Sequence, residues 1–288
     1  MKDYAILMDV SGDVDRSYSE QGKVTLLPME FIINGEVYLY TDDESGMTTK
    51  QFYDFVRAKA PMSTAKITPM KWMEFFEPYA KQGISVICSV LSSGLTNAID
   101  GAREVAEELM SKYPGVEIYP IDSLGATGVE GLICERMISN KEKGLSVKEN
   151  FEDVSEFTHK LRATAYVDDL DALKRGGRIS RTVAFVGGLL GIKPLIQFDK
   201  EGTLSMWGKQ RGYKPSINKV VEYYTEKADL DNPQIVYITH ADEESYANEL
   251  AEKIKAVSPL ATIKIRVLSP IIGVHLGPGA MVLSFVEK

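Results

Sequence analysis

The stretch ISVICSVLSSGLTN, residues 84–97, carries the pattern that decides the fold. Its first seven residues are a short apolar run, typical of a buried strand. A turn of serine, glycine and threonine follows, and helix signals extend from Ser93 to Lys112. Strand, polar turn and helix also follow one another from residues 4–8 and again from residues 116–121. Three such units predict a parallel α/β sheet.

Ligands of such sheets bind beyond the carboxyl ends of the strands, which points to the turns at residues 9–13, 92–97 and 122–127. In the second turn, hydroxyls and free N–H groups at the positive end of a helix favour an anion. Capping of the helix by Ser93 or Thr96 explains the same residues without a ligand. The two roles can coexist on neighbouring residues.

The pattern changes after about residue 162. Hairpin signals and isolated strands predict an α+β arrangement for the second half. The expected division is an N-terminal α/β domain at 1–164 and a C-terminal α+β domain at 165–288. The other elements predicted are a hairpin at 31–40, helices at 48–59, 69–81, 216–227 and 243–256, a second hairpin at 195–207, and strands at 164–168, 234–239, 262–267 and 280–286.

Composition excludes several classes of protein. The 288 residues are 44% hydrophobic and 26% charged, as in an ordinary globular protein, and the net charge of −8 disfavours nucleic acid as a partner. Two cysteines are too few for a disulfide framework, and neither a signal peptide nor a membrane-spanning run is present. We therefore expect a soluble, cytoplasmic protein without an integral membrane segment.

Familiar catalytic signatures are absent from the sequence. The three histidines, His159, His240 and His275, are scattered, and neither cysteine has a partner at metal-ligand spacing. The chain has no G-x-S-x-G elbow, no phosphate-binding Walker loop and no G-x-G-x-x-G that opens a helix. We expect no metal and no cofactor.

His275 lies in GVHLGPG, residues 273–279, just before the last predicted strand. The three glycines and the proline indicate a loop of special backbone shape, held by the sheet. Loops on a rigid scaffold often carry binding groups, although an idle surface turn fits the segment equally well.

Two further segments have two interpretations each. Residues 181–196 are apolar on nearly all sides, which indicates either a buried helix or the lining of a cavity for an aliphatic ligand. The candidate lining residues are Phe185, Leu189, Leu190 and Ile192. Basic side chains at Arg178, Lys209 and Arg211 indicate either a solvated surface or a docking patch for an acidic partner.

A hydroxyl-rich loop, PMSTAKITP at residues 61–69, separates two predicted helices. Its simplest interpretation is a connection in which Thr68 caps the helix that begins at Pro69. A role for its serine or threonine in binding comes only from the resemblance described next.

Several motifs in order resemble the DegV family of fatty-acid-binding proteins along almost the whole chain. The most specific are LKRGGRIS at 173–180, GIKP at 191–194 and HLGPG at 275–279, with SSGLTN at 92–97 in support. The opening motif DVSGD at 9–13 matches imperfectly, and the family's Thr-Ser-Gln loop corresponds to Thr64-Ala65-Lys66 or, one residue earlier, to Ser63-Thr64.

The resemblance implies a two-domain DegV-like fold that holds one long-chain fatty acid between the domains. It maps the family's carboxylate-binding positions to Thr64, Thr96 and His275. It also implies a carrier, with no enzymatic activity of its own, that presents the fatty acid to an ATP-binding fatty acid kinase. That partner would form acyl-phosphate for phospholipid biosynthesis.

Physical chemistry supports this division of roles. Burial of each methylene is worth about 0.8 kcal/mol, but a carboxylate needs hydrogen-bond donors when it leaves water. We expect Asn97 to add an amide donor to the two threonines and the histidine. The alternatives are a hydrolase or acyltransferase that uses Thr96 or a serine with His275, and a regulatory lipid sensor without a kinase partner.

Overall fold

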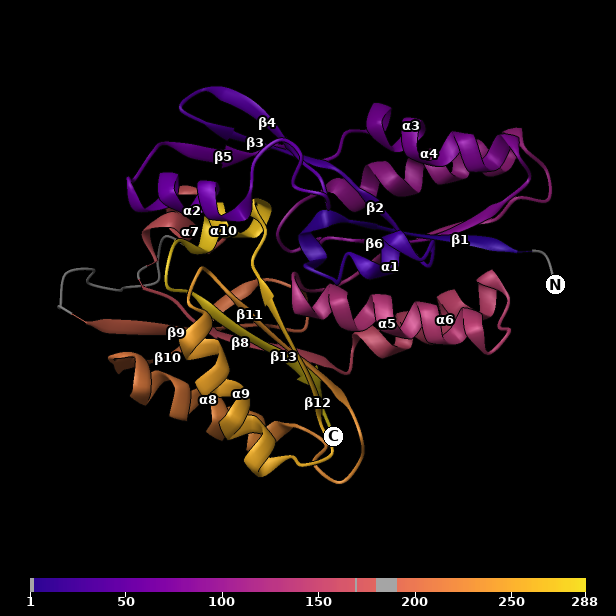
Figure 1. The fold of residues 1–288 in the computed structure, drawn as a ribbon. Coiled ribbons are helices and arrows are strands. Elements are labelled where there is room, and N and C mark those ends of the chain that lie inside the picture. Colours follow the sequence, from indigo (N-terminus) through magenta and orange to yellow (C-terminus); the bar gives the residue numbers. More distant parts are fainter. Residues whose placement is uncertain (1–2, 169, 180–190) are drawn as a thin grey trace.

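The computed structural model describes residues 3–168, 170–179 and 191–288, which form three sheets and the helices around them (Figure 1). The first sheet is parallel and has the strand order β2 (Thr25–Leu27), β1 (Tyr4–Asp9), β6 (Ser85–Val90) and β7 (Ile118–Asp122). Every residue of β6 is buried. The predicted parallel sheet is confirmed.

Helices cover both faces of this sheet, which explains why β6 is a continuous apolar run. In Figure 1, α3 (Pro69–Lys81) and α4 (Ala98–Lys112) lie on one face, and α5 (Gly128–Glu142) and α6 (Val147–Thr158) lie on the other. The helix expected at 69–81 is confirmed, with Thr68 as its N-cap and Pro69 in its first turn.

The start of α4 differs from the expectation. Helix signals begin at Ser93, but the helix begins at Ala98, with Asn97 at the N-cap and no side-chain capping bond. Residues 92–96 instead form a turn in which the amides of Leu95 and Thr96 both donate to the carbonyl of Ser92, each at 3.0 Å. Capping by Ser93 or Thr96 is therefore wrong, because the turn occupies the chain before the helix starts.

The second sheet is a small antiparallel one, in the order β4 (Glu36–Tyr40), β3 (Met29–Ile33) and β5 (Met62–Thr64). The β3–β4 hairpin turns at Asn34 and Gly35, with φ values of 53° and 87°, as a two-residue hairpin loop requires. Helix α2 (Thr49–Arg57) follows it. β5 forms where we expected only a connecting loop, because Ser63 and its neighbours pair with the edge of β3.

The third sheet has six strands, in the order β10 (Leu204–Arg211), β9 (Ile192–Phe198), β8 (Leu161–Tyr166), β13 (Met281–Val286), β11 (Ile235–His240) and β12 (Thr262–Val267). Helices α8 (Tyr213–Lys227) and α9 (Glu244–Val257) cover its outer face. This mixed part confirms the α+β expectation for the second half of the chain.

Helix α5 joins the two large sheets, since it packs against β6 of the first and against β8, β11 and β13 of the third. Its glycines permit this close approach. A Cβ atom at Gly128 would lie 2.5 Å from the Cβ of Tyr237, and one at Gly131 would lie 2.8 Å from the Tyr237 ring.

The boundary expected between residues 164 and 165 falls inside β8, and the whole of that strand belongs to the six-stranded sheet. The division into two domains remains a prediction. Two short helices, α7 (Asp171–Arg175) and α10 (Pro270–Leu276), pack together, and α10 also contacts α2 and β5. Remaining short elements are η1 (Val10–Gly12) and α1 (Ser17–Glu20). Among the described residues, no helix is long and apolar enough to cross a membrane.

Candidate functional site

The three polar turns expected at the carboxyl ends of the parallel strands do lie together. The amide of Leu91 donates to Asp9 Oδ2 at 3.2 Å, and the amide of Ser93 donates to Asp122 Oδ1 at 3.0 Å. Asp13 Oδ2 accepts from the Thr127 hydroxyl at 2.6 Å. The parallel topology therefore assembles one polar edge from segments more than a hundred residues apart.

A cavity lies between this edge and the inner face of the six-stranded sheet, with an empty volume of about 890 Å³ that is partly open to solvent. We call it the main cavity; its size is within the range typical of small-molecule sites. Its walls come from both large sheets, from β5 and from α10. The lining residues are Asp9, Met29, Thr64, Ala65, Lys66, Ile67, Leu91, Leu95, Thr96, Ala98, Ala126, Thr127, Ala163, Thr164, Ala165, Leu173, Arg178, Ile196, Gln197, Phe198, Leu204, Ile271, Ile272, His275, Leu276 and Val282.

Most of the wall is apolar, and its part along β8 is made of small residues. Ala163 and Ala165 alternate along β8 on the face that looks toward the parallel sheet, and both are buried. Ile196 and Val282 flank Ala165 on the neighbouring strands. Because alanine side chains end at Cβ, the sheet leaves space here that larger residues would fill.

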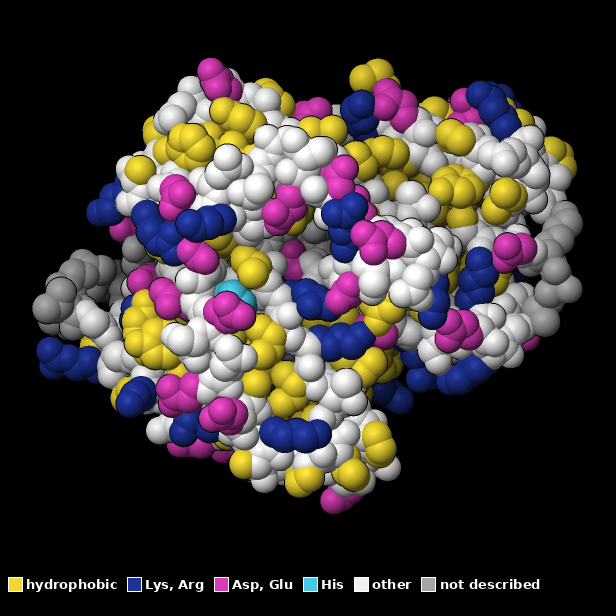
Figure 2. All heavy atoms as spheres, viewed as in Figure 1, with side chains coloured by type: hydrophobic (Ala, Val, Ile, Leu, Met, Phe, Trp, Pro, Cys, Tyr) yellow, Lys and Arg dark blue, Asp and Glu magenta, His cyan; other side chains and the backbone are white. Residues whose placement is uncertain are grey.

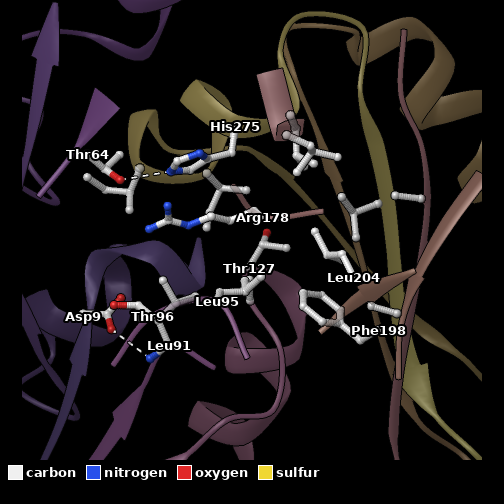
Figure 3. Close-up of a pocket in the computed structure, with 18 of the residues that line it drawn as sticks. Asp9, Thr64, Leu91, Leu95, Thr96, Thr127, Arg178, Phe198, Leu204 and His275 are labelled. Atoms are coloured by element: carbon white, nitrogen blue, oxygen red, sulfur yellow. Dashed lines mark hydrogen bonds between the residues drawn. The ribbon is translucent and has the colours of Figure 1, made fainter. Parts of the chain in front are cut away.

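Polar side chains gather at one end of the main cavity, as Figure 3 shows. We call this group the polar end: Thr64 from β5, Thr96 from the turn before α4, Arg178 after α7, and His275 from α10. The Thr64 hydroxyl and His275 Nε2 are 3.0 Å apart and form a hydrogen bond. Phe198 and Leu204 lie at the opposite end in the same view.

His275 is held as a neutral imidazole. Burial, together with the nearby positive charge of Arg178, lowers its pKa to about 4. Its Nδ1 is buried and has no hydrogen-bond partner among the described residues. One Arg178 nitrogen donates to the carbonyl of Gly176, and no ion pair links Arg178 to a carboxylate in the described part of the chain. A positive charge and several donors thus line this end of the main cavity, where the buried Asp9 carboxyl, whose pKa is raised by burial, lies beside Thr96.

The backbone at His275 differs from the expected loop. His275 lies in the last turn of α10, which begins at Pro270 and ends before Gly277, where φ is 74°. The prediction of a loop is wrong for residues 273–276, because Pro270 and Gly277 act as helix start and stop signals. It is confirmed for residues 277–279, where Gly277 and Gly279 both have positive φ.

The structure distinguishes Thr64 from Ser63 at the hydroxyl-rich loop. Thr64 lines the main cavity and contacts His275, whereas Ser63 is exposed and pairs with Ile32 in the sheet. Asn97 lies beside the cavity and not in its wall, because it is exposed at the start of α4. Its side-chain oxygen accepts from Lys66 Nζ at 2.8 Å.

The other expected residues fall in different places. Phe185, Leu189 and Leu190 lie outside the described residues. Ile192 begins β9 opposite Arg211 and does not line the main cavity. Lys209 and Arg211 are exposed on the edge strand β10, while Arg178 lines the cavity, so the three basic residues do not share one surface as a docking patch requires.

A buried carboxyl pair beneath the turns has no motif that would reveal it in the sequence. The Ser11 hydroxyl contacts both Asp9 Oδ1 and, at 2.7 Å, Glu130 Oε2. A hydroxyl carries one proton, so one of the two carboxyl groups must supply another. Burial raises the pKa of Asp9 and of Glu130, which agrees with a shared proton.

Possible metal ligands and charged surface residues in the rest of the described chain do not form a strong alternative site. Within the described ranges, no group of three or more histidine, cysteine, aspartate or glutamate side chains could hold a metal ion. On the face drawn in Figure 2, basic and acidic side chains are interspersed, so this face carries no basic stripe of the kind that binds nucleic acid.

The family model described as "Uncharacterised protein, DegV family" matches residues 3–288. The chain belongs to the DegV family. A DegV domain-containing protein of Clostridium perfringens is 33% identical over 286 residues, which cover 99% of this chain and 98% of the relative.

Solved DegV structures have the same fold. Bacillus subtilis DegV, described as a fatty acid binding protein, has a TM-score of 0.85 and 26% identity, with complete coverage of both chains. A DegV-family protein from Ruminococcus gnavus, refined with vaccenic acid, has a TM-score of 0.87 and 20% identity, covering 98% of this chain and 99% of that one. The predicted DegV-like fold is confirmed.

Proposed function

We propose that this chain binds one long-chain fatty acid in the main cavity, with the carboxylate at the polar end and the acyl chain along the alanine-lined wall. One observation carries the proposal: Thr64, Thr96, Arg178 and His275 lie together at one end of the main cavity, whereas most of the remaining lining residues are apolar. This is the polarity of a fatty acid. The description of the Bacillus subtilis relative as a fatty acid binding protein and the vaccenic acid of the Ruminococcus gnavus relative support the same ligand class.

Arg178 joins the residues expected from the sequence as the charged partner of the carboxylate. A buried carboxylate needs both hydrogen bonds and a compensating charge, and neutral donors alone leave it costly to desolvate. Thr64 and Thr96 supply hydroxyls, and Arg178 supplies the positive charge, since His275 is neutral. The acyl chain adds about 0.8 kcal/mol for each methylene that leaves water.

In this proposal His275 acts through Thr64. If Nε2 carries the proton, it donates to the Thr64 oxygen over 3.0 Å and leaves the Thr64 hydroxyl proton for the ligand. Nδ1 then carries no proton and needs no acceptor, so its buried position leaves no N–H group without a partner. The neutral histidine therefore orients the Thr64 hydroxyl and does not add a second positive charge beside Arg178.

The finer part of the proposal is that the loaded protein is a carrier for a separate ATP-dependent kinase in the cytoplasm, which converts the carboxylate to acyl-phosphate for phospholipid biosynthesis. Thr64, Thr96 and His275 are each partly exposed, so in this proposal a partner reaches the carboxylate at the polar end. Lys209 and Arg211 on β10 are candidate contacts for an acidic partner face.

Two alternatives use the same residues. A hydrolase or acyltransferase needs a basic histidine beside its nucleophile, but a pKa of about 4 makes His275 a weak base, and its contact is Thr64 and not Thr96. A regulatory lipid sensor would use the same cavity and differ only in lacking a kinase partner.

Native mass spectrometry of the purified protein, followed by lipid extraction, tests the central claim. We expect one fatty acid per chain. Absence of any bound fatty acid, together with no binding of added palmitate or stearate, would overturn the proposal. Turnover of an ester or thioester by the protein alone would favour the enzyme instead, and phosphorylation of bound fatty acid only when a kinase and ATP are added would support the carrier.

A further inference from the structure

A second cavity lies behind the end of the main cavity that is opposite the polar end. It has an empty volume of about 680 Å³, which includes space open to solvent, and we call it the distal cavity. Its lining is mixed: Leu124, Val129 and Leu161 are apolar, and the polar lining residues are Thr158, His159, Arg162, Asp199 and Lys200. Nothing in the proposed function so far uses this space.

Two residues, Ala163 and Phe198, line both cavities. The side chain of Ala163 is a single methyl group, so the Phe198 ring is the larger part of the partition. Ala163 follows the start of β8, and Phe198 ends the neighbouring strand β9. The main cavity therefore follows the inner face of β8 from the polar end to Phe198, and the distal cavity continues in the same direction.

The partition has a fixed backbone, because the β9–β10 turn is tied to the parallel sheet. The Ser92 hydroxyl donates to the carbonyl of Gly202 at 2.8 Å. A Cβ atom at Gly94 would lie 2.3 Å from the same carbonyl oxygen, so the two turns are in close contact. Inside the turn, Asp199 accepts from the amides of Glu201 and Thr203 at 2.9 and 3.0 Å.

We infer that Phe198 sets the longest acyl chain that this protein accommodates, and that the distal cavity receives the end of a longer chain once this ring is removed. The inference rests on the proposed function. Each methylene that packs against apolar lining such as Leu124, Val129 and Leu161 tightens binding by up to about fourfold, whereas carbons stopped at the Phe198 ring add nothing. Two charged lining residues of the distal cavity already have partners, since Arg162 pairs with Glu287 and Asp199 accepts from the amides of Glu201 and Thr203, so their charges do not exclude an apolar chain.

Competition binding with saturated fatty acids of increasing length tests this inference. For the wild type, affinity should rise with chain length and then stop rising at one length, which we call the break. The affinity of the Phe198→Ala protein should continue to rise beyond that length, by up to about fourfold for each added carbon. The matched control is Phe75→Ala, a half-buried phenylalanine of α3 that lines neither cavity, which should keep the wild-type break.

Two more variants complete the test. Phe198→Ala/Leu124→Trp refills the distal cavity and should restore the break, and Phe198→Trp should move it to a shorter chain. A folded Phe198→Ala protein whose break stays at the wild-type length would overturn the inference. If Phe198→Ala does not fold, a break that stays at the wild-type length in Phe198→Trp would overturn the inference instead. Failure of the wild type to bind any length would instead refute the proposed function.

Discussion

Nδ1 of His275 faces Gly176 so closely that a Cβ atom at Gly176 would lie 2.6 Å from it. The first glycine of the Gly176-Gly177 pair thus makes room for the imidazole, in addition to ending α7. A methyl group there must displace either the ring or the chain that follows α7, which carries Arg178.

Gly176→Ala should therefore weaken fatty-acid binding by about tenfold, the loss of roughly one good hydrogen bond to a charged group. Isothermal titration with palmitate measures this. Gly208→Ala on β10 is the control, because its new methyl group meets only the end of the Leu195 side chain, at 3.3 Å. Equal affinities of the Gly176→Ala and Gly208→Ala proteins would show that Gly176 has no effect on binding at the polar end.

Removal of the Thr64 hydroxyl without a change of shape tests the donor arrangement. Thr64→Val should weaken binding by about 5- to 100-fold, because it leaves both the carboxylate and His275 Nε2 without their partner. Thr64→Ser keeps the hydroxyl and should recover most of the affinity. Ser63→Ala is the neighbouring control, since Ser63 is exposed on the other side of β5.

The titration of His275 should respond to ligand and to Arg178. In the free protein its pKa is about 4, lowered first by burial and second by Arg178. A bound carboxylate favours the protonated ring, so ligand should raise the pKa, and Arg178→Met should raise it in the free protein. NMR titration of the imidazole reports both shifts. A ring that titrates at the same pH with and without fatty acid would place the carboxylate elsewhere.

Asp13 should make the protein less stable as pH rises. Burial raises its pKa from 3.8 to about 7, so between these values the folded protein holds a proton that the unfolded chain has released. The contribution of this group to the free energy of unfolding therefore falls as pH rises from about 4 to about 7. Asp13→Asn, which stays neutral in both states, should lose this part of the slope.

Denaturant unfolding of both proteins across that pH range measures the difference. Asn retains an oxygen that can accept from the Ser269 amide, which Asp13 now does at 2.9 Å, so a loss of fold is not expected. Parallel pH profiles for the two proteins would show that Asp13 is ionised throughout the range.

Much of the architecture could be predicted from local pattern. The apolar run that becomes β6, the Asn34-Gly35 turn and the Thr68-Pro69 helix start each depend on a few adjacent residues. Elements that are stabilised by residues distant in the sequence could not be predicted in this way. β5 has three residues and exists because it pairs with β3, and His275 lies in a helix that the sequence presented as a loop.

The candidate site follows the same rule. Thr64, Thr96 and His275 were expected from motifs, and they lie around one cavity. Arg178 was assigned to the surface, because the direction of a long side chain depends on the tertiary contacts of α7. The pairing of Ser11 with Glu130 joins residues 119 positions apart and has no local signal.

The contact between Ser92 and Gly202 also bears on how fast a ligand could be exchanged. Walls from both large sheets enclose the main cavity, so a wide exit along its length requires this contact to open. The rate of release would then depend on this opening motion of the protein as well as on the length of the acyl chain. In the proposed carrier, a lipid held in this way would stay with its protein until a partner acts on the carboxylate.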